Sequence, residues 1–296
     1  MYLRFPESGD SRRMCGQTEK GDAVIKLAVM TSVCPDWTVE EIIRGMKRHG
    51  YQGLEPRVEW NHRAGIELEL SPDERRKLRE MFEDEGLRIC CISTGVRMAV
   101  PDRAERQGQI DSLHRYIDLA SDLGAGLVRT FGGPRARDME LRGVVNYVAD
   151  GYREVLPHAE ERGVTVLMET HDDWSCSNRV REVVETVGHP NLRALWDIMH
   201  PARMLERPEE TFNTIGEHTG HVHVHDGKYS EDKSHIALCP LGEGDIDHAT
   251  PIRLLEEAGF DGYLSVEVIH RPGSVYDADG AMEQYAKALC SYLTKA

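Results

Sequence analysis

Short apolar runs alternate with longer, helix-like segments along most of the chain. The apolar runs have the length of buried β-strands, and several of the longer segments stop at a glycine, which favours the position just after a helix. These signals predict eight strands, at Ile25–Met30, Gln52–Glu55, Leu87–Ser93, Leu127–Phe131, Val164–Glu169, Leu192–Asp197, His221–Asp226 and Tyr263–Ile269.

Helix-start signals stand at the expected places between these strands. Thr38-Val39-Glu40-Glu41 has the spacing of a capping box, and Ser71-Pro72 places an N-cap candidate before a proline at the first helical position. The predicted helices are Thr38–His49, Ser71–Gly86, Arg103–Leu123, Met139–Arg162, Asn178–Val187, Pro208–His218, Pro251–Ala258 and Ala278–Leu293.

Eight consecutive strand–helix units without a break in composition predict one α/β domain, a single (β/α)8 TIM barrel over residues 24–296. Its active site is expected at the C-terminal ends of the strands. An open, doubly wound sheet is the alternative, but no glycine-rich phosphate-binding fingerprint follows the first strand. Residues 1–23 are polar and mixed in charge, and they predict an N-terminal tail.

The seventh predicted strand reads His221-Val222-His223-Val224-His225-Asp226. Alternate side chains of a strand point to opposite faces, so the three histidines share one face and the valines the other. In a barrel the valines would pack under an outer helix, and the histidines would point into the lumen near its mouth. Three imidazoles facing one space suggest a metal or proton-handling site, although a half-buried strand with a solvated face explains this strand equally well.

Acids stand at the ends of the neighbouring strands. Strand five is apolar until Glu169, strand six ends at Asp197, and Glu267 lies between apolar neighbours on strand eight. A buried carboxylate is costly unless it is paired or bound to a cation. Four side chains are therefore predicted to meet at one point, namely Glu169, Asp197, His223 and Glu267. Such a set suits Mn²⁺ or Mg²⁺, with Zn²⁺ or Co²⁺ as alternatives. A salt bridge to an inward-facing arginine could explain any single acid, but it is a much weaker explanation for the whole set.

The amino-acid composition limits the kinds of partner that the protein can have. The chain has 51 acidic and 36 basic residues and a formal net charge of −15, which argues against a nucleic-acid partner. Its seven cysteines form no C-x-x-C pair, which is typical of a reducing cytoplasm. The sequence has no apolar run of membrane-spanning length and no secretory signal pattern. We expect a cytoplasmic protein with a small-molecule partner and no membrane partner; a homo-oligomer stays open.

Short motifs mark most of the strand ends. They are Gly50-Tyr-Gln-Gly-Leu-Glu55, Met168-Glu169-Thr-His171, Asp197-Ile-Met-His200, His223-Val-His-Asp226, Gly242-Glu-Gly-Asp-Ile-Asp247 and Ser265-Val-Glu267. In the order and strand placement of these motifs, the chain resembles the xylose-isomerase-like superfamily of sugar isomerases and epimerases, which are TIM barrels. The resemblance runs from Ile25 to the C-terminus, and it identifies a superfamily and not a substrate.

The resemblance implies one divalent metal ion, with Mn²⁺ preferred, held by Glu169, Asp197, His223 and Glu267. It also implies that Glu169 and Glu267 form an acid/base pair. A metal that chelates a ketone oxygen and a neighbouring hydroxyl acidifies the carbon between them and stabilises an enediolate. One glutamate would remove the proton and the other would return it to the opposite face, while His200 would hydrogen-bond the carbonyl oxygen.

Other side chains at strand ends are candidates for substrate binding. They are Glu55, Arg129, His171, His225, Lys228 and Arg271, with Arg57 as a further possibility. For each cation, a salt bridge to a neighbouring acid is at least as good an explanation. Glu55 is expected to contact the substrate or a ligand and not the metal, and His221 is expected to be a packed core histidine.

The predicted function is a metal-dependent isomerase or epimerase of a sugar, sugar phosphate or keto-sugar derivative. The alternative is a dehydratase of a keto-inositol or related keto-polyol, with His200 or His171 as general acid. Endonuclease IV-type DNA-repair enzymes share the barrel, but their additional zinc ligands have no histidine counterpart at the ends of strands two to four. A vestigial binding protein is disfavoured because it has no reason to retain costly buried acids.

Overall fold

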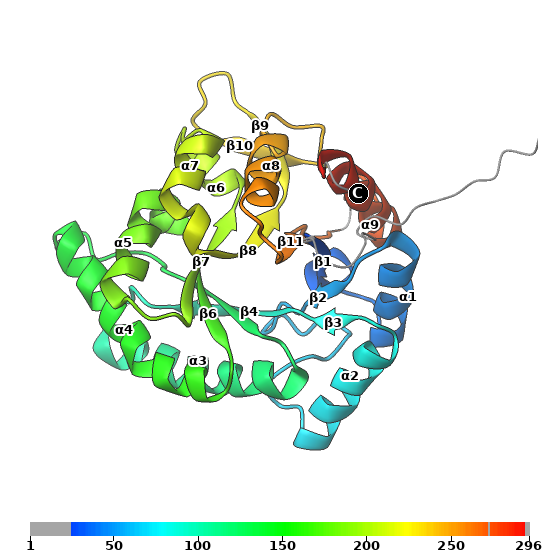
Figure 1. Ribbon diagram of the computed structural model, residues 1–296, viewed down its shortest axis with the longest axis horizontal. Helices are drawn as coiled ribbons and strands as arrows, with labels where there is room; N and C mark the ends of the chain where they lie inside the picture. Colours follow the sequence, from blue (N-terminus) through cyan, green and yellow to red (C-terminus); the bar gives the residue numbers. More distant parts are fainter. Residues whose placement is uncertain (1–24, 272, 294–296) are drawn as a thin grey trace, which may run out of the picture.

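The computed structural model describes residues 25–271 and 273–293 of the 296-residue chain. The tail predicted over residues 1–23 lies outside this described part. Within it, parallel strands form a barrel that is surrounded by helices (Figure 1). The predicted TIM barrel is confirmed.

The barrel strands follow the order β3-β2-β1-β11-β8-β7-β6-β5-β4, and every neighbouring pair is parallel. They are β1 (Lys26–Met30), β2 (Gly53–Glu55), β3 (Arg88–Ile89), β4 (Cys91–Arg97), β5 (Leu127–Phe131), β6 (Thr165–Glu169), β7 (Leu192–Asp197), β8 (Thr219–Val224) and β11 (Tyr263–Val266).

The barrel closes through one continuous segment. The predicted third strand is divided at Cys90, so that β3 pairs with β2 while β4 pairs with β5. An isolated parallel bridge between Arg57 and Ser93 adds a further link between the end of β2 and β4. β3 and β4, the two outermost strands of the sheet order, therefore follow each other directly in the chain and occupy one strand position of the barrel. Counted in this way, the described strands fill eight positions.

The helices begin where the sequence signals place them. Thr38 and Ser71 each form the predicted capping box, and Gly50 ends the first helix in the left-handed conformation at φ 80°. The helices are α1 (Val39–His49), α2 (Pro72–Asp84), α3 (Arg103–Leu123), α4 (Leu141–Glu161), α5 (Ser177–Val187), α6 (Met199–Arg203), α7 (Pro208–Ile215), α8 (Ala249–Glu257) and α9 (Ala278–Tyr292).

Two strand boundaries near the site differ from the prediction. β8 begins at Thr219 and ends at Val224, so His225 lies just beyond it, and β11 ends at Val266, one residue before Glu267. After β8, the chain forms an antiparallel hairpin of β9 (Asp226–Tyr229) and β10 (Ile236–Cys239), which the sequence pattern did not predict. The short helix α6 was also not predicted. The hairpin and α6 both lie at the carboxyl ends of the strands, where they shape the site.

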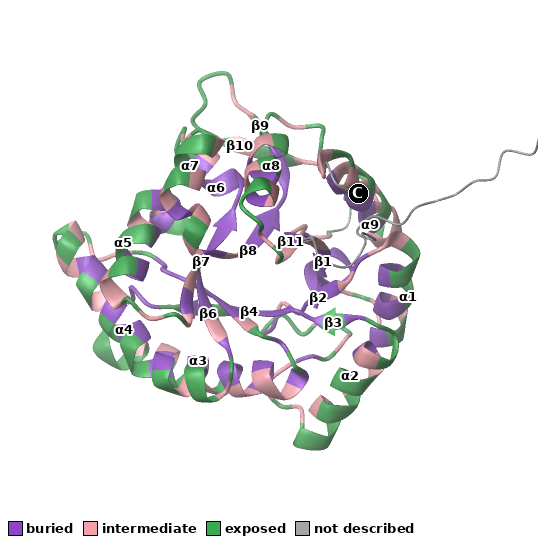
Figure 2. Ribbon diagram, viewed as in Figure 1, coloured by how far each residue is buried: buried purple, intermediate pink, exposed green. Residues whose placement is uncertain are grey.

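Valines and histidines alternate along β8, so that the valines face the hydrophobic core and the histidines face the barrel interior. Val222 and Val224 are fully buried in the main hydrophobic core between strands and helices. His221 and His223 are also fully buried, but both contact Glu55 of β2 across the barrel interior. The predicted division of valines outward and histidines inward is confirmed for these residues by their contacts. Most of β8 is buried (Figure 2). No helix among the described residues has the length and apolar character needed to span a membrane.

Candidate metal centre

The four predicted ligands come together at the carboxyl ends of four adjacent strands. Glu169 ends β6, Asp197 ends β7, His223 lies near the end of β8, and Glu267 follows β11. Each offers one ligand atom, and these atoms all lie within 4.8 Å of one another. Parallel pairing explains the convergence, because Asp197 is in register with His223 and His223 with Ser265.

Several atoms of this group face one another without forming hydrogen bonds. Both carboxylate oxygens of Glu169 and the Nδ1 atom of His223 are buried and have no hydrogen-bond partner among the described residues. The Nδ1 atom lies 2.9 Å from Oε2 of Glu267 and 3.4 Å from Oε1 of Glu169. Buried acceptors that crowd one point need a cation or protons there. This donor set fits a hard divalent metal ion.

Glu55 contacts His223 on the side of the ring that faces away from the other acids. Its Oε1 lies 3.0 Å from Nε2 of His223, and its Oε2 lies 2.9 Å from Nε2 of His221. The Ser93 hydroxyl also donates to Oε1 of Glu55. Burial opposes ionisation of Glu55, but His223 and His221 outweigh it and hold the pKa of this carboxyl well below its usual value.

This arrangement has a consequence for the ligand atom. Because the carboxylate of Glu55 engages Nε2 of His223, the other ring nitrogen, Nδ1, is left to face the acids. Glu55 is fully buried, and its oxygens are engaged by protein groups. These contacts favour support of His223 over a substrate contact. His221 is buried as expected, but it is a polar partner of Glu55 and not a purely packed side chain.

Asp197 is oriented by the start of α6. Its Oδ1 accepts hydrogen bonds from the backbone N–H groups of Met199, at 2.9 Å, and His200, at 3.2 Å. Its Oδ2 lies 2.8 Å from Nε2 of His225. Burial opposes its ionisation, yet His225 and His200 lower the pKa of Asp197 below its usual value. The Asp197-Ile-Met-His200 motif is therefore a strand end joined to a helix start, which fixes the carboxylate.

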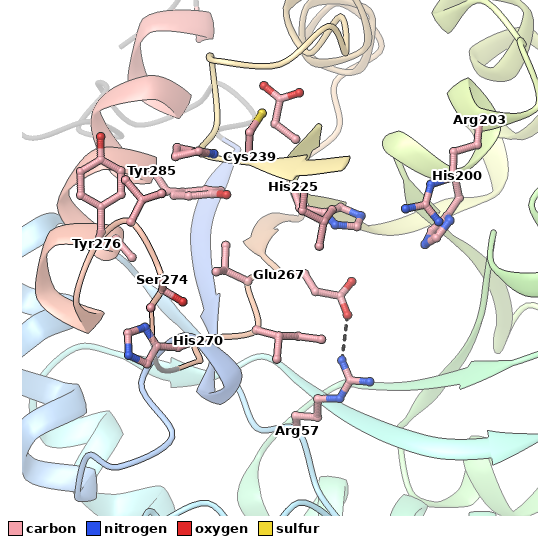
Figure 3. A pocket seen from close by; sticks show the side chains of 18 of the residues that line it. Arg57, His200, Arg203, His225, Cys239, Glu267, His270, Ser274, Tyr276 and Tyr285 are labelled. Carbon is pink, nitrogen blue, oxygen red and sulfur yellow. Dashed lines mark hydrogen bonds and ion pairs between the residues drawn. The ribbon is translucent and has the colours of Figure 1, made fainter. Parts of the chain in front are cut away.

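Three histidines line the mouth above the acids. The ring of His171 lies 4.4 Å from that of His200, and the ring of His200 lies 5.7 Å from that of His225. All three border a cavity of about 390 Å³, together with Glu267 and Arg57. Figure 3 shows His200, His225, Glu267 and Arg57 around this cavity. Burial lowers the pKa of His200 to about 4. A neutral imidazole at this place can donate a hydrogen bond to a substrate oxygen.

Two arginines pair with the two glutamates. Arg57 donates from Nη1 to Oε1 of Glu267 at 2.9 Å (Figure 3). The same guanidinium lies over the Trp60 ring. Arg129 is fully buried, with Nε 3.3 Å from Oε2 of Glu169, and it donates from Nη1 to the Thr94 carbonyl. Arg57 borders the cavity, whereas Arg129 does not. The burial of Arg129 and its contact with Glu169 favour a role in orienting Glu169.

The remaining predicted contacts are farther away. Lys228 on β9 and Arg271 after β11 are exposed, and neither borders the cavity. Most other cavity residues were missing from the prediction, among them Arg203, Tyr276 and Tyr285. Arg203 lies one helical turn after His200, and that spacing was a usable signal. The two tyrosines belong to the segment from the β11–α9 loop into α9, for which no motif was available.

The glycine-rich motif after β8 is structural. Asp226 is buried, and its Oδ2 accepts hydrogen bonds from the backbone N–H groups of Gly242, at 2.9 Å, and Gly244, at 3.1 Å. A Cβ atom at Gly244 would stand 2.0 Å from Oδ1 of Asp226. The motif therefore anchors the loop that follows the β9–β10 hairpin, one wall of the cavity.

The protein is a TIM barrel of eight parallel strand positions, and acids and a histidine converge at the carboxyl ends of its strands. The family model described as "Xylose isomerase-like TIM barrel" matches residues 43–295. The chain belongs to this family.

Individual relatives are distant. The fructoselysine 3-epimerase of Shigella flexneri is 23% identical over 177 residues, which make up 58% of this chain and 63% of that relative. The chain thus matches somewhat less than two thirds of the length of this curated relative. Among solved structures, the IolI protein with a bound zinc atom is 18% identical, with a TM-score of 0.79 over 92% of this chain and 99% of that one. The probable 3-DHS dehydratase AsbF of Bacillus anthracis is 19% identical, with a TM-score of 0.72 over 90% and 98%. These structural likenesses establish the fold.

Proposed function

We propose that this chain is a divalent-metal-dependent isomerase or epimerase of a sugar, sugar phosphate or keto-sugar derivative. The observation that carries the proposal is the convergence of Glu169, Asp197, His223 and Glu267 within 4.8 Å beside a cavity. Membership of the family and the similarity to a fructoselysine 3-epimerase support it. Mn²⁺ is the proposed metal, and Mg²⁺, Co²⁺ and Zn²⁺ suit the same donor set.

The metal would supply Lewis-acid polarisation of a substrate carbonyl. The protein groups then have distinct tasks. One of the two glutamates removes the proton from the carbon next to that carbonyl, and the other returns a proton to the opposite face. Arg57 holds Oε1 of Glu267, and Arg129 lies against Oε2 of Glu169, so each glutamate is oriented by a cation.

His200 is the third proposed catalytic residue. It is buried, borders the cavity and lies with its Nε2 atom 3.8 Å from Oδ2 of Asp197. From this place it would donate a hydrogen bond to the substrate oxygen and share the negative charge that develops on it. His171 and His225 border the same cavity and are proposed substrate contacts.

A dehydratase is the second candidate, because two imidazoles share the mouth of the site. The His171 ring lies 4.4 Å from the His200 ring, so one histidine could hold the carbonyl oxygen while the other protonates a leaving hydroxyl. The similarity in fold to a probable 3-DHS dehydratase keeps this outcome open. Isomerisation and dehydration share the first proton abstraction.

One experiment separates the two candidates. Ketoses, their phosphates and keto-inositols are incubated with the protein and Mn²⁺ in deuterium oxide and followed by NMR. Deuterium incorporation without loss of water is expected for an isomerase or epimerase. Formation of an enone would identify the dehydratase instead. Absence of exchange with every compound of the panel would contradict the proposal.

Composition supports the remaining proposals. The net charge of −15 favours a small-molecule substrate over a nucleic acid. The described cysteines, Cys34, Cys90, Cys91, Cys176, Cys239 and Cys290, form no disulfide, which supports a cytoplasmic location.

A further inference from the structure

The cavity beside the proposed metal centre has two chemically different parts. Its charged lining residues are Arg57, Arg203, Asp226 and Glu267. In Figure 3, Tyr276 and Tyr285 lie on the opposite side of Glu267 from His200 and Arg203. The lining also contains a set of large apolar and aromatic side chains, called the apolar arm, namely Leu238, Pro240, Ile269, Val275, Tyr276 and Tyr285. Ser274 and His270 lie on the same side of Glu267 as the two tyrosines (Figure 3).

The apolar arm is built from three separate elements. Leu238 comes from β10, Ile269 and Val275 come from the loop after β11, and Tyr285 comes from α9. Leu238 is 62% exposed and Val275 is 75% exposed, which is unusual for large hydrophobic side chains. Exposed apolar side chains that gather at the rim of a cavity mark a ligand groove more often than a chance feature of the surface.

The aliphatic side chains of this wall, Leu238, Pro240, Ile269 and Val275, offer no hydrogen-bond partner to an unsubstituted sugar, and its polar groups are limited to a few side chains such as Ser274 and His270. A free ketose carries hydroxyl groups along its whole length, and each hydroxyl that leaves water without a new hydrogen bond costs free energy. Asp226, the first residue of the hairpin, adds no such bonds, because its oxygens accept from the N–H groups of Gly227, Gly242 and Gly244. A group without hydroxyls or charge would bury the exposed apolar side chains instead.

We infer that the substrate is a sugar or polyol derivative with an uncharged, apolar or aromatic substituent, and that this substituent binds in the apolar arm while the polar end meets the acids. The inference rests on the proposed function for the polar end. It adds that recognition extends beyond the reacting carbons, along the hairpin and the β11–α9 loop. An unsubstituted hexose or a sugar phosphate would leave the arm unfilled.

Matched pairs of probes test the inference through binding alone. One pair is 1-deoxy-1-benzylamino-fructose and 1-deoxy-1-amino-fructose, and the other is 6-O-benzyl-fructose and fructose, so that either end of the sugar can carry the benzyl group. Dissociation constants are measured with Zn²⁺-loaded protein, since this ion is diamagnetic. Methyl NMR of the same samples locates the bound benzyl group at Leu238, Ile269 or Val275.

We expect at least one benzyl derivative to bind tenfold or more tightly than its parent and to shift these methyl signals. Leu238→Ser should remove most of that gain, and Val275→Ser part of it. Both side chains are exposed, so an unchanged thermal midpoint will show that the variants fold. Met139→Ser is the matched control, because Met139 is 40% exposed and does not border the cavity.

Equal affinities within both pairs, or methyl shifts confined to other parts of the protein, would overturn the inference. Retention of the full gain by Leu238→Ser would overturn it as well. Deuterium exchange on the same compounds distinguishes the two levels of the account. A benzyl preference without exchange would reject the proposed reaction and keep the apolar arm, whereas exchange without a benzyl preference would reject the arm alone.

Discussion

Two clusters of acids and histidines lie one above the other in the barrel, and they differ in how their polar atoms are paired. In the lower cluster, Glu55 gives one oxygen to His221 and the other to His223. In the upper cluster, the carboxylate oxygens of Glu169 and the Nδ1 atom of His223 have no hydrogen-bond partner in the described part of the chain. Similar residue types therefore form a hydrogen-bonded network in the lower cluster and the proposed ligand set in the upper cluster.

His223 links the two clusters through its two ring nitrogens. Nε2 faces Glu55 at 3.0 Å, and Nδ1 faces Glu267 at 2.9 Å. A carboxylate that orients a metal-binding histidine from behind is a common feature of metal sites. The clear difference lies in the carboxylates, since both oxygens of Glu55 have hydrogen-bond partners and those of Glu169 have none in the described part of the chain, while Nδ1 of His221 in the lower cluster also lacks a partner. Unpaired carboxylate oxygens, more than the presence of acids and histidines, therefore distinguish the candidate metal site from the buried polar network.

The largest expected effect comes from the upper cluster. Glu267→Gln keeps the shape of the side chain but removes its ability to take up a proton, so exchange of substrate hydrogen should fall by about 10²–10⁴-fold. Deuterium incorporation measured by NMR checks this value. Glu283→Gln on α9 is the matched control, because this glutamate is exposed and pairs with Lys287. Normal exchange by Glu267→Gln would show that the two-glutamate mechanism is wrong.

Metal should stabilise the folded protein through the upper cluster. A ligand that binds only the native state adds about 2.7 kcal/mol to the free energy of unfolding when its free concentration is 100 times Kd. We expect Mn²⁺ to raise the thermal midpoint and a chelator to reverse the increase. Asp197→Asn should lose most of this response, since it weakens a ligand. An unchanged midpoint at saturating Mn²⁺ would argue against a metal site.

The lower cluster should affect metal binding indirectly. Glu55→Gln removes the negative charge behind His223, and loss of such a partner typically costs about 10–100-fold in metal affinity. Titration calorimetry with Mn²⁺ measures this change. Lys228→Ala serves as the comparison on the protein surface. If Glu55→Gln bound Mn²⁺ as tightly as the unaltered protein, the two clusters would be independent.

The smallest effect is expected at the exposed cations. Lys228 and Arg271 do not border the cavity, so replacing either by alanine should change substrate turnover by less than about twofold, in line with the small effects of most surface substitutions. Steady-state rates with the substrate found by the exchange screen provide the test. A large increase in KM for Arg271→Ala would place this arginine in the substrate site after all.

The sequence was sufficient for the barrel and for the convergence of the four proposed ligands. Strand periodicity and the position of Glu169 and Asp197 at strand ends are local signals, and parallel pairing brings such ends together. The link between Glu55 and His223 could not be predicted, because 168 positions separate them and the contact depends on how the barrel closes. The hairpin after β8 was also missed, since its short strands carry no strong alternation.

The pairing of the arginines shows the same limit. Arg57 and Arg129 both lie at strand ends, and the sequence could not decide between a substrate and a neighbouring acid as partner. The structure pairs Arg57 with Glu267 and Arg129 with Glu169. Only the depth of each side chain in the barrel separates them, since Arg57 borders the cavity and Arg129 is fully buried.

The central claim is that a divalent metal ion binds in the upper cluster and not in the lower one. Anomalous diffraction from crystals of the protein grown with Mn²⁺ tests it directly. We expect one peak, with Glu169, Asp197, Nδ1 of His223 and Glu267 each at about 2.2 Å from it. A peak between Glu55, His221 and His223, or no peak with the glutamates still paired to Arg57 and Arg129, would contradict metal binding in the upper cluster.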